Sequence, residues 1–285
     1  MKNDFLKLYS KVFLTSVGII GTITGIVSFF FTLESIIKGS VMDRFFCLVI
    51  GLLVLCVMDF VITVCISKKS SVTIYKKEKT NIKFEYLQFD DITKTTNGEK
   101  TTIVIPVNTY IPCIGDAQII KDGSIHKEFL NYLSSKGILF DDAVIRRIHQ
   151  SNGKISKDKC RIGDWFILNP EDFENKTSIK FILVAVCNLT VSNGKKVIKK
   201  ASKDEYFYCI QTIINCICEQ CDIEENVYIP LIGAGNADIE KSKDIMFMMQ
   251  ELLMFNKDNL KQHIHIFLNE KYKDETPLYA LRKHQ

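Results

Sequence analysis

The sequence predicts an α/β protein in which a two-helix transmembrane hairpin precedes a three-layer α/β/α sandwich with a mixed, largely parallel sheet. Three observations lead to this fold class. Two apolar stretches of membrane-spanning length come first, short β-branched runs then alternate with helical patterns, and one of these runs ends in a glycine-rich turn. Strands that alternate with helices typically form a mostly parallel sheet covered on both faces.

The first two predicted helices are long and apolar. Residues 12–33 carry no charge, and residues 45–66 carry only Asp59. At a rise of about 1.5 Å per residue each stretch spans roughly 33 Å, enough to cross the hydrocarbon core of a bilayer. Lysines gather before the first stretch and after the second. The excess of cytoplasmic lysine in membrane proteins then predicts a multi-pass protein with both termini in the cytoplasm.

Small residues and one carboxylate distinguish these stretches. Gly21 and Gly25 form a small-xxx-small pair, together with Gly18. We expect this surface to pack within the hairpin, because small residues allow membrane helices to approach closely. Asp59 lies two turns from the cytoplasmic end of its stretch. It either approaches the interface or bonds to the neighbouring helix, or it lines a route that opens when subunits assemble.

The rest of the sequence predicts the strands and helices of the sandwich. We expect a hairpin at residues 1–67, a basic linker and first strand at 68–81, and the α/β domain at 82–285. Within them the β-branched and alternating runs predict strands at 71–75, 82–89, 101–107, 165–168, 179–186, 227–232 and 263–268. The helical spacings predict helices at 124–136, 203–221 and 240–255. Asn-Gly turns and lysines predict surface loops or hairpins at 141–163 and 187–200.

Charge and cysteine content argue against several functions. The net charge is only +4 and the basic residues are dispersed, so no nucleic-acid partner is expected. Ten cysteines without a small disulfide framework fit a reducing cytosol. Cys216, Cys218 and Cys221 lie near one another, but they fall on one predicted helix with no second CxxC, so packed cysteines are favoured over a metal site. No metal is expected.

Small and polar residues follow the predicted strands at four places. They are Asp90 to Thr93, Asn108 to Tyr110, Gly123 to His126, and Gly233 to Ala237. Ligands of open α/β sheets bind outside the carboxyl ends of strands, so these segments are the candidate site. Glycines 233 and 235 can adopt positive φ, and successive backbone N–H groups there can surround an anion. The same turn also fits an ordinary strand-to-helix connection.

The order of these four segments resembles the macro domain, a module that binds ADP-ribose. Asp91-Ile92-Thr93 resembles a Gly-Asp-Ile-Thr turn with Asp90 in the glycine place, and Ile105 to Asn108 resembles a strand entering an Asn-containing loop. Gly123-Ser124-Ile125-His126 is similar to an Ala-Ile-His helix start. Pro230 to Gly235 is similar to the Pro-Ala-Ile-Gly-Thr-Gly phosphate loop, which is the most specific of the four. The resemblance covers roughly residues 82–270.

The resemblance implies a role for each segment. Asp91 would accept a hydrogen bond from the adenine amino group, and Ile92 would offer its backbone N–H to the ring. The segment at the start of the helix and the glycine loop would hold the diphosphate with backbone N–H groups, while the loop after the third strand would face the distal ribose. The residues implied for the diphosphate are Ser124, Ile125, Gly233, Ala234, Gly235, Asn236 and Ala237, and those for the ribose are Asn108 and Tyr110. Thr109 and His126 complete the predicted ligand-binding set. Asp91 also fits a helix cap, His126 a packed side chain, and Tyr110 a core residue.

Hydrolytic macro domains generally have a second Asn three residues after the first, and a run of glycines. Here Ile111 occupies that place and the loop has one glycine. The second Asn and the glycines would position the attacking water, so their absence favours a binding protein over an enzyme. We therefore expect no catalytic residues and no cofactor.

The two halves together resemble membrane-anchored macro-domain effectors of bacterial Thoeris-type antiphage defence. The resemblance implies an inner-membrane protein whose macro domain binds an ADP-ribose-derived signal, including one conjugated to an amino acid, that a TIR-domain enzyme makes from NAD. Binding would favour a homo-oligomer that disrupts the lipid bilayer and causes abortive infection. A membrane-tethered ADP-ribosyl hydrolase and a passive anchor or transporter accessory are the alternatives.

Overall fold

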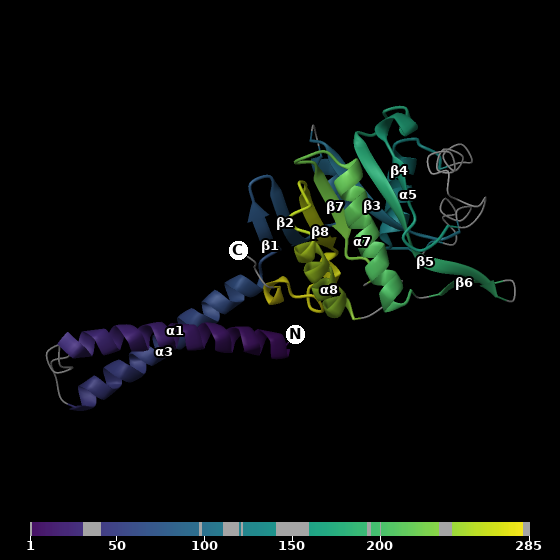
Figure 1. Cartoon of the computed structure of the whole chain (residues 1–285). Helices are drawn as coiled ribbons and strands as arrows, with labels where there is room; N and C mark the ends of the chain where they lie inside the picture. The colour runs from purple at the N-terminus through teal and green to yellow at the C-terminus, as the bar shows by residue number, and fades with distance from the viewer. Residues whose placement is uncertain are drawn as a thin grey trace. The chain divides into compact units, whose positions relative to one another are not determined.

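The computed structural model describes residues 2–30, 41–96, 99–110, 120, 122–140, 160–192, 195–199, 201–233 and 241–281. The chain divides into two compact units, one from Met1 to Lys69 and the other from Ser70 to Gln285. The described part of the first contains two helices, and the second contains the sheet and the helices that cover it (Figure 1).

Helices α1 (Lys2–Phe30) and α3 (Val41–Ser67) pack against each other in the first unit. Residues 49–66 of α3 form, in the described part of the chain, the one helix long and apolar enough to cross a membrane, with a mean hydropathy of 2.8, whereas α1 holds a shorter apolar stretch at Leu8–Gly21. Length and composition alone support a membrane span here, and the same properties occur in the core helices of soluble proteins.

The glycines of α1 do not pack within the hairpin as expected. A Cβ atom added at Gly18 or at Gly21 would meet no heavy atom within 4 Å. The expectation was wrong for Gly18 and Gly21 because they lie about 140–200° around the helix from Ser16, which bonds to α3. The surroundings of Gly25 lie outside the described residues. The expectation that Asp59 bonds to the neighbouring helix is confirmed, since its carboxylate accepts a hydrogen bond from Ser16 at 2.8 Å.

The second unit is built on a mixed sheet of eight described strands. Along the main path the order is β1-β2-β8-β7-β3-β5-β4, and β6 pairs with an extension of β5. The pairs β2–β8, β8–β7, β7–β3 and β3–β5 are parallel, while β1, β4 and β6 pair antiparallel with their neighbours. The strands are β1 (Ser71–Lys77), β2 (Thr80–Tyr86), β3 (Thr101–Asn108), β4 (Trp165–Leu168), β5 (Ile179–Ser192), β6 (Lys195–Lys199), β7 (Asn226–Pro230) and β8 (His263–Leu268).

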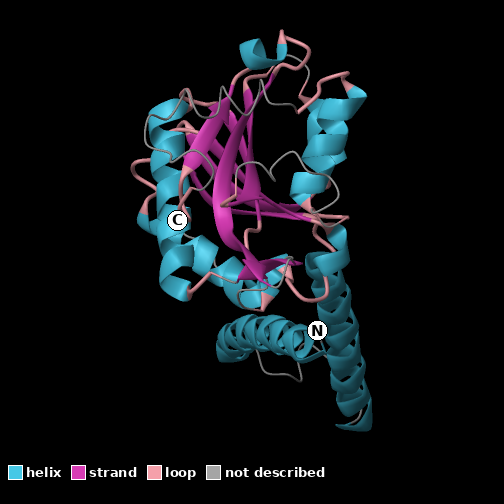
Figure 2. Cartoon of the chain, turned by 90° about the vertical axis from the view of Figure 1, so that its right-hand side faces the viewer, coloured by secondary structure: helices cyan, strands magenta, loops and turns pink. Residues whose placement is uncertain are grey.

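Helices cover both faces of this sheet, so the second unit has three layers (Figures 1 and 2). On one face, α7 (Lys203–Gln220) and α8 (Ser242–Phe255) enclose a core that includes Val104, Ile213 and Met246. On the other, α4 (Phe89–Thr95) and α5 (Ile125–Ser135) enclose a core that includes Ile103 and Phe129. Residues 103 and 104 enter opposite cores because successive side chains of a strand point to opposite faces.

Local sequence explains where α7 begins. Ser202 precedes its first turn, and the Ser202 hydroxyl accepts a hydrogen bond from the Glu205 N–H at 3.2 Å. The Glu205 carboxylate in turn accepts from the Ser202 N–H at 2.8 Å. This reciprocal capping pair satisfies two N–H groups that a helix start leaves without partners, and typically stabilises it by about 1 kcal/mol.

The structure differs from the predicted elements at several ends. Strand β2 ends at Tyr86 instead of residue 89, and the segment expected to be a turn contains the short helix α4. Strand β5 continues to Ser192 and forms a hairpin with β6, as the Asn-Gly turn predicted. The predicted loop at 141–163 lies outside the described residues up to 159. Short 3₁₀ helices complete the fold at Pro170–Phe173, Glu270–Tyr272 and Leu278–Ala280.

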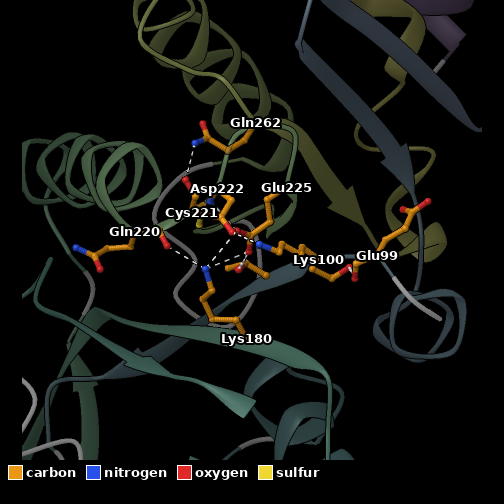
Figure 3. A network of polar contacts seen from close by, with 10 residues as sticks. Glu99, Lys100, Lys180, Gln220, Cys221, Asp222, Glu225 and Gln262 are labelled. Atoms are coloured by element: carbon orange, nitrogen blue, oxygen red, sulfur yellow. Dashed lines mark hydrogen bonds and ion pairs between the residues drawn. The ribbon is translucent and has the colours of Figure 1, made fainter. Parts of the chain in front are cut away.

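A buried ionic network joins the amino ends of the parallel strands (Figure 3). The Glu225 side chain, only 1% exposed, pairs with the Lys180 ammonium at 3.2 Å. It also accepts hydrogen bonds from the Thr102 hydroxyl and, at 2.7 Å, from the Asp222 N–H. The Asp222 carboxylate pairs with Lys100 at 2.5 Å on the surface. Together these contacts tie β3 and β5 to the loop that leads into β7.

Candidate functional site

The candidate residues gather at the carboxyl edge of the sheet. Strands β2, β8, β7, β3 and β5 are neighbours in that order and run parallel, so their carboxyl ends lie along one edge. Three of the predicted segments follow β2, β7 and β3. At about 4.8 Å per strand, the distance from β2 to β3 is roughly 14 Å, which suits an extended ligand better than a single phosphate.

After β2 the chain enters α4, which contains Asp91 and Ile92. The Asp91 carboxylate is exposed and accepts a hydrogen bond from the Gln88 N–H at 3.3 Å, so it caps its own helix as one prediction had it. The Ile92 side chain is 1% exposed, and its N–H donates to the Gln88 carbonyl at 3.3 Å. The Ile92 N–H is therefore already used by the first turn of α4, whereas the Asp91 carboxylate stays accessible.

After β3 the chain makes a tight local turn. The Asn108 side-chain oxygen accepts a hydrogen bond from the Tyr110 N–H at 2.8 Å, which fixes the direction of the loop. Asn108 is 7% exposed and Thr109 is fully buried, and the Thr109 N–H donates to the Cys187 carbonyl at 3.0 Å. Thr109 thus anchors the loop to β5. Tyr110 is half-buried, and Ile111 lies outside the described residues.

The start of α5 offers a backbone donor. Ser124 precedes the helix, and its hydroxyl accepts a hydrogen bond from the Lys127 N–H at 3.2 Å, while its carbonyl accepts from Glu128 at 3.0 Å. The described structure gives the N–H of Ile125, the first helical residue, no bond. Helix starts of this kind attract anions. His126 is buried, at 6% exposed, so its imidazole does not lie on the surface.

The glycine-rich turn begins as the sequence predicted. Gly233 follows β7 with φ of +89°, in the region that favours glycine. β7 pairs in parallel with the first residues of β3, so this turn and the Asn108 loop follow neighbouring strands. The other predicted phosphate-binding residues of this loop, Ala234, Gly235, Asn236 and Ala237, lie outside the described residues.

Sequence reasoning missed two residues near these segments. Glu128, one turn into α5, is half-buried; burial raises the pKa of its carboxyl, the charge of Asp90 raises it further, and Lys271 lowers it. Glu128 therefore lies close to α4, the helix that carries Asp90 and Asp91. Asn188 lies on β5, one residue beyond the position that pairs with Asn108, and its side-chain oxygen accepts a hydrogen bond from the Thr109 hydroxyl at 3.4 Å. Only the pairing of β3 with β5 could have revealed Asn188.

Three described cysteines of the second unit, Cys187, Cys209 and Cys221, have largely buried thiols. Among the described residues, no cluster of three or more His, Cys, Asp or Glu side chains could hold a metal ion. Burial raises the pKa of the Cys187 thiol to about 11 and those of Cys209 and Cys221 to about 12. Since the thiolate is the reactive form, these groups are unreactive at neutral pH.

Comparison with known proteins identifies the family. The family model described as "Thoeris protein ThsA, Macro domain" matches residues 86–269, about two thirds of the chain. The chain belongs to this ThsA macro-domain family. The matched range begins at the end of β2 and closes just after β8, so it contains all four candidate segments.

The macro domain is also similar to solved structures at low sequence identity. A point mutant of the Oceanobacillus iheyensis macrodomain is 13% identical, with 72% of this chain and 92% of that chain covered and a TM-score of 0.41. The Mycobacterium tuberculosis DarG macrodomain is 14% identical over 65% of this chain and 96% of that one, with a TM-score of 0.40.

The Trypanosoma brucei macrodomain in complex with ADP-ribose is 10% identical, over 62% of each chain, with a TM-score of 0.39. These scores are too low to transfer residue roles. A comparison with curated proteins gave no match.

Proposed function

We propose that this protein is an antiphage-defence effector whose macro domain binds an ADP-ribose-derived signal and whose helical hairpin inserts into the bacterial inner membrane. A TIR-domain enzyme supplies the signal, including one conjugated to an amino acid. Binding favours an assembly of copies that disrupts the bilayer and stops the infected cell. The protein itself carries out no reaction.

The arrangement of the carboxyl edge supports nucleotide binding. An accessible carboxylate at Asp91, the N–H of Ile125 at a helix start and the positive φ of Gly233 lie at three places along one edge. The observation that carries the proposal is that these features occur together in a chain of the ThsA macro-domain family. Backbone donors can hold a diphosphate without a cluster of basic side chains, which fits the dispersed positive charge.

The polarity of the hairpin supports membrane insertion. Two polar side chains of α3, Asp59 and Thr63, are buried, at 2% and 0% exposed. Large apolar side chains such as Leu14, Leu53 and Val57 are instead 60–68% exposed. Exposed apolar and buried polar side chains are the reverse of the pattern in water-soluble helices, and a lipid environment removes the cost of this arrangement.

The signal acts by selecting one state of the protein. A ligand shifts an equilibrium only by its difference in affinity for the two states, and a change from mostly inactive to mostly active needs about 5.5 kcal/mol. The macro domain must therefore bind the signal more tightly in the assembled protein than in the separate copies. Tight binding without this difference would leave the membrane intact.

Full-length protein reconstituted in vesicles of bacterial lipid tests the proposal. We expect the small-molecule fraction of infected cells that contain the TIR-domain enzyme to release an encapsulated dye, and mass spectrometry of the retained molecule to show an ADP-ribose moiety. The same fraction from cells without that enzyme is the control. Release of free ADP-ribose from modified proteins, with no leakage under any condition, would instead support the tethered hydrolase.

A further inference from the structure

Asp59 is a buried carboxylate with an incomplete set of hydrogen bonds. It lies in α3 and is 2% exposed. Its Oδ1 atom accepts a hydrogen bond from the Ser16 hydroxyl of α1 at 2.8 Å. Its Oδ2 atom is fully covered and has no hydrogen-bond partner within the described part of the chain. A buried oxygen without a donor is costly, and more so for a carboxylate than for a neutral group.

The neighbouring hydroxyl groups of the described hairpin already have partners; that of Tyr9 is hydrogen-bonded with the Cys56 side chain. The Thr63 hydroxyl, one turn further along α3, donates to the backbone carbonyl of Asp59 at 2.7 Å. The Thr15 hydroxyl, beside Ser16, donates to the Lys11 carbonyl at 2.8 Å within its own helix. Neither can serve Oδ2 without giving up an existing bond. The second donor for Asp59 therefore has to come from a residue other than Thr63 or Thr15.

We propose that Asp59 is a hydrogen-bonding contact between copies of this chain, formed when their hairpins assemble in the membrane. The inference rests on the membrane insertion proposed above, because the hydrocarbon core contains no water to supply the missing donor. Assembly brings a second hairpin, with its own hydrogen-bond donors, to this depth of the bilayer. Polar side chains buried between helices stabilise the association of membrane helices in this way.

The surface of the hairpin allows a second copy to approach closely. A Cβ atom at Gly21 of α1 or at Gly51 of α3 would meet no heavy atom within 4 Å, so both backbones are open to a neighbour. Oδ2, however, is covered in the single hairpin. The two helices must therefore move relative to each other before a second copy reaches Asp59, and the Ser16–Asp59 hydrogen bond opposes that movement.

Association of the full-length chain in vesicles, without nucleotide, tests the contact. Energy transfer between copies labelled with donor and acceptor dyes gives the association constant. We expect Asp59→Leu to lower it about 3- to 20-fold, the range that interhelical hydrogen bonds span in membranes. Asp59→Asn keeps a hydrogen-bonding side chain and should stay within about 3-fold of wild type. Ser16→Ala removes the opposing bond and should raise association by about 3-fold.

Thr15→Ala is the matched control, since Thr15 is exposed and bonds only within its own helix in the described structure. Equal or stronger association of Asp59→Leu would overturn the proposal, as would weaker association of Ser16→Ala. Resistance to alkaline extraction measures insertion separately. Extraction of the wild-type chain would contradict the membrane function, whereas normal insertion with association independent of Asp59 would contradict only this contact.

Discussion

Removal of the Lys180 ammonium should strongly destabilise the second unit. In Lys180→Met the Glu225 carboxylate, 1% exposed, would lose its cation and keep only the Thr102 hydroxyl and the Asp222 N–H. Lys180 also donates to the Gln220 carbonyl at the end of α7, at 2.9 Å, and this bond would be lost too. Breaking a buried pair typically costs about 3–5 kcal/mol, and since two donors remain we expect about 3 kcal/mol.

Lys100→Met is the matched control in the same network. Lys100 pairs with Asp222 at 2.5 Å, but the two side chains are 76% and 62% exposed. Solvent screens an exposed pair of this kind, so it contributes little to stability. In a domain of this size 1 kcal/mol changes Tm by about 2–4 °C, so we expect a loss of about 6–12 °C for Lys180→Met and a much smaller loss for Lys100→Met.

Fluorescence of Trp165 provides the assay. It is the only tryptophan of the chain and lies in β4, so its signal follows unfolding of the sheet and not of the helical hairpin. The double variant Lys180→Met with Glu225→Leu should recover most of the loss, because no buried charge is left. Similar Tm values for Lys180→Met and Lys100→Met would refute the reasoning.

Two further predictions concern local contacts. Burial raises the pKa of Glu85, but hydrogen bonds from His265 and a neighbouring lysine outweigh it and hold that pKa below its usual value of 4.5. The stabilisation is therefore present above pH 4.5 and lost as the pH falls through the folded-state pKa, so the difference in urea-unfolding free energy between wild type and Glu85→Gln should shrink below about pH 4.5. Gly163 has φ of +90°, and a Cβ there would lie 2.7 Å from the Tyr208 ring, whereas Gly137, at φ +67°, faces open space. Gly163→Ala should lower the free energy of unfolding by more than the roughly 1–2 kcal/mol expected for Gly137→Ala. Equal losses of this free energy in urea unfolding would show that the Tyr208 ring moves aside without cost.

Most of the sheet could be predicted from sequence because its strands are short, apolar and bounded by turns. The run at 263–268 and the run at 101–107 coincide with β8 and β3 to within one residue. Helix α4 was missed because seven residues beginning Phe-Asp-Asp are too few to show a helical period. The network around Glu225 was also missed, since Lys180 lies 45 residues away and only the fold brings the two together.

The candidate site could be predicted in order but not in detail. The ends of β2, β3 and β7 follow from the strand pattern, and parallel pairing places them on one edge. Sequence could not tell that Thr109 is buried under β5 or that the Ile92 N–H is already used by α4. The first depends on the pairing of β3 with β5, and the second on a short helix whose period the sequence does not show.

Calorimetric titration of the full-length protein with ADP-ribose tests the central claim most directly. Ile125→Pro removes one backbone N–H at the first helical position, where proline is tolerated, and the extended backbone of Ser124, with ψ of 149°, suits a following proline. Ile125→Ala shortens the same side chain and keeps the N–H.

We expect wild type to bind at one site and Ile125→Pro to bind at least tenfold more weakly, as for loss of a hydrogen bond to a charged group. Ile125→Ala should stay within about threefold of wild type. No saturable binding by wild type, or equal weakening by both substitutions, would contradict the account.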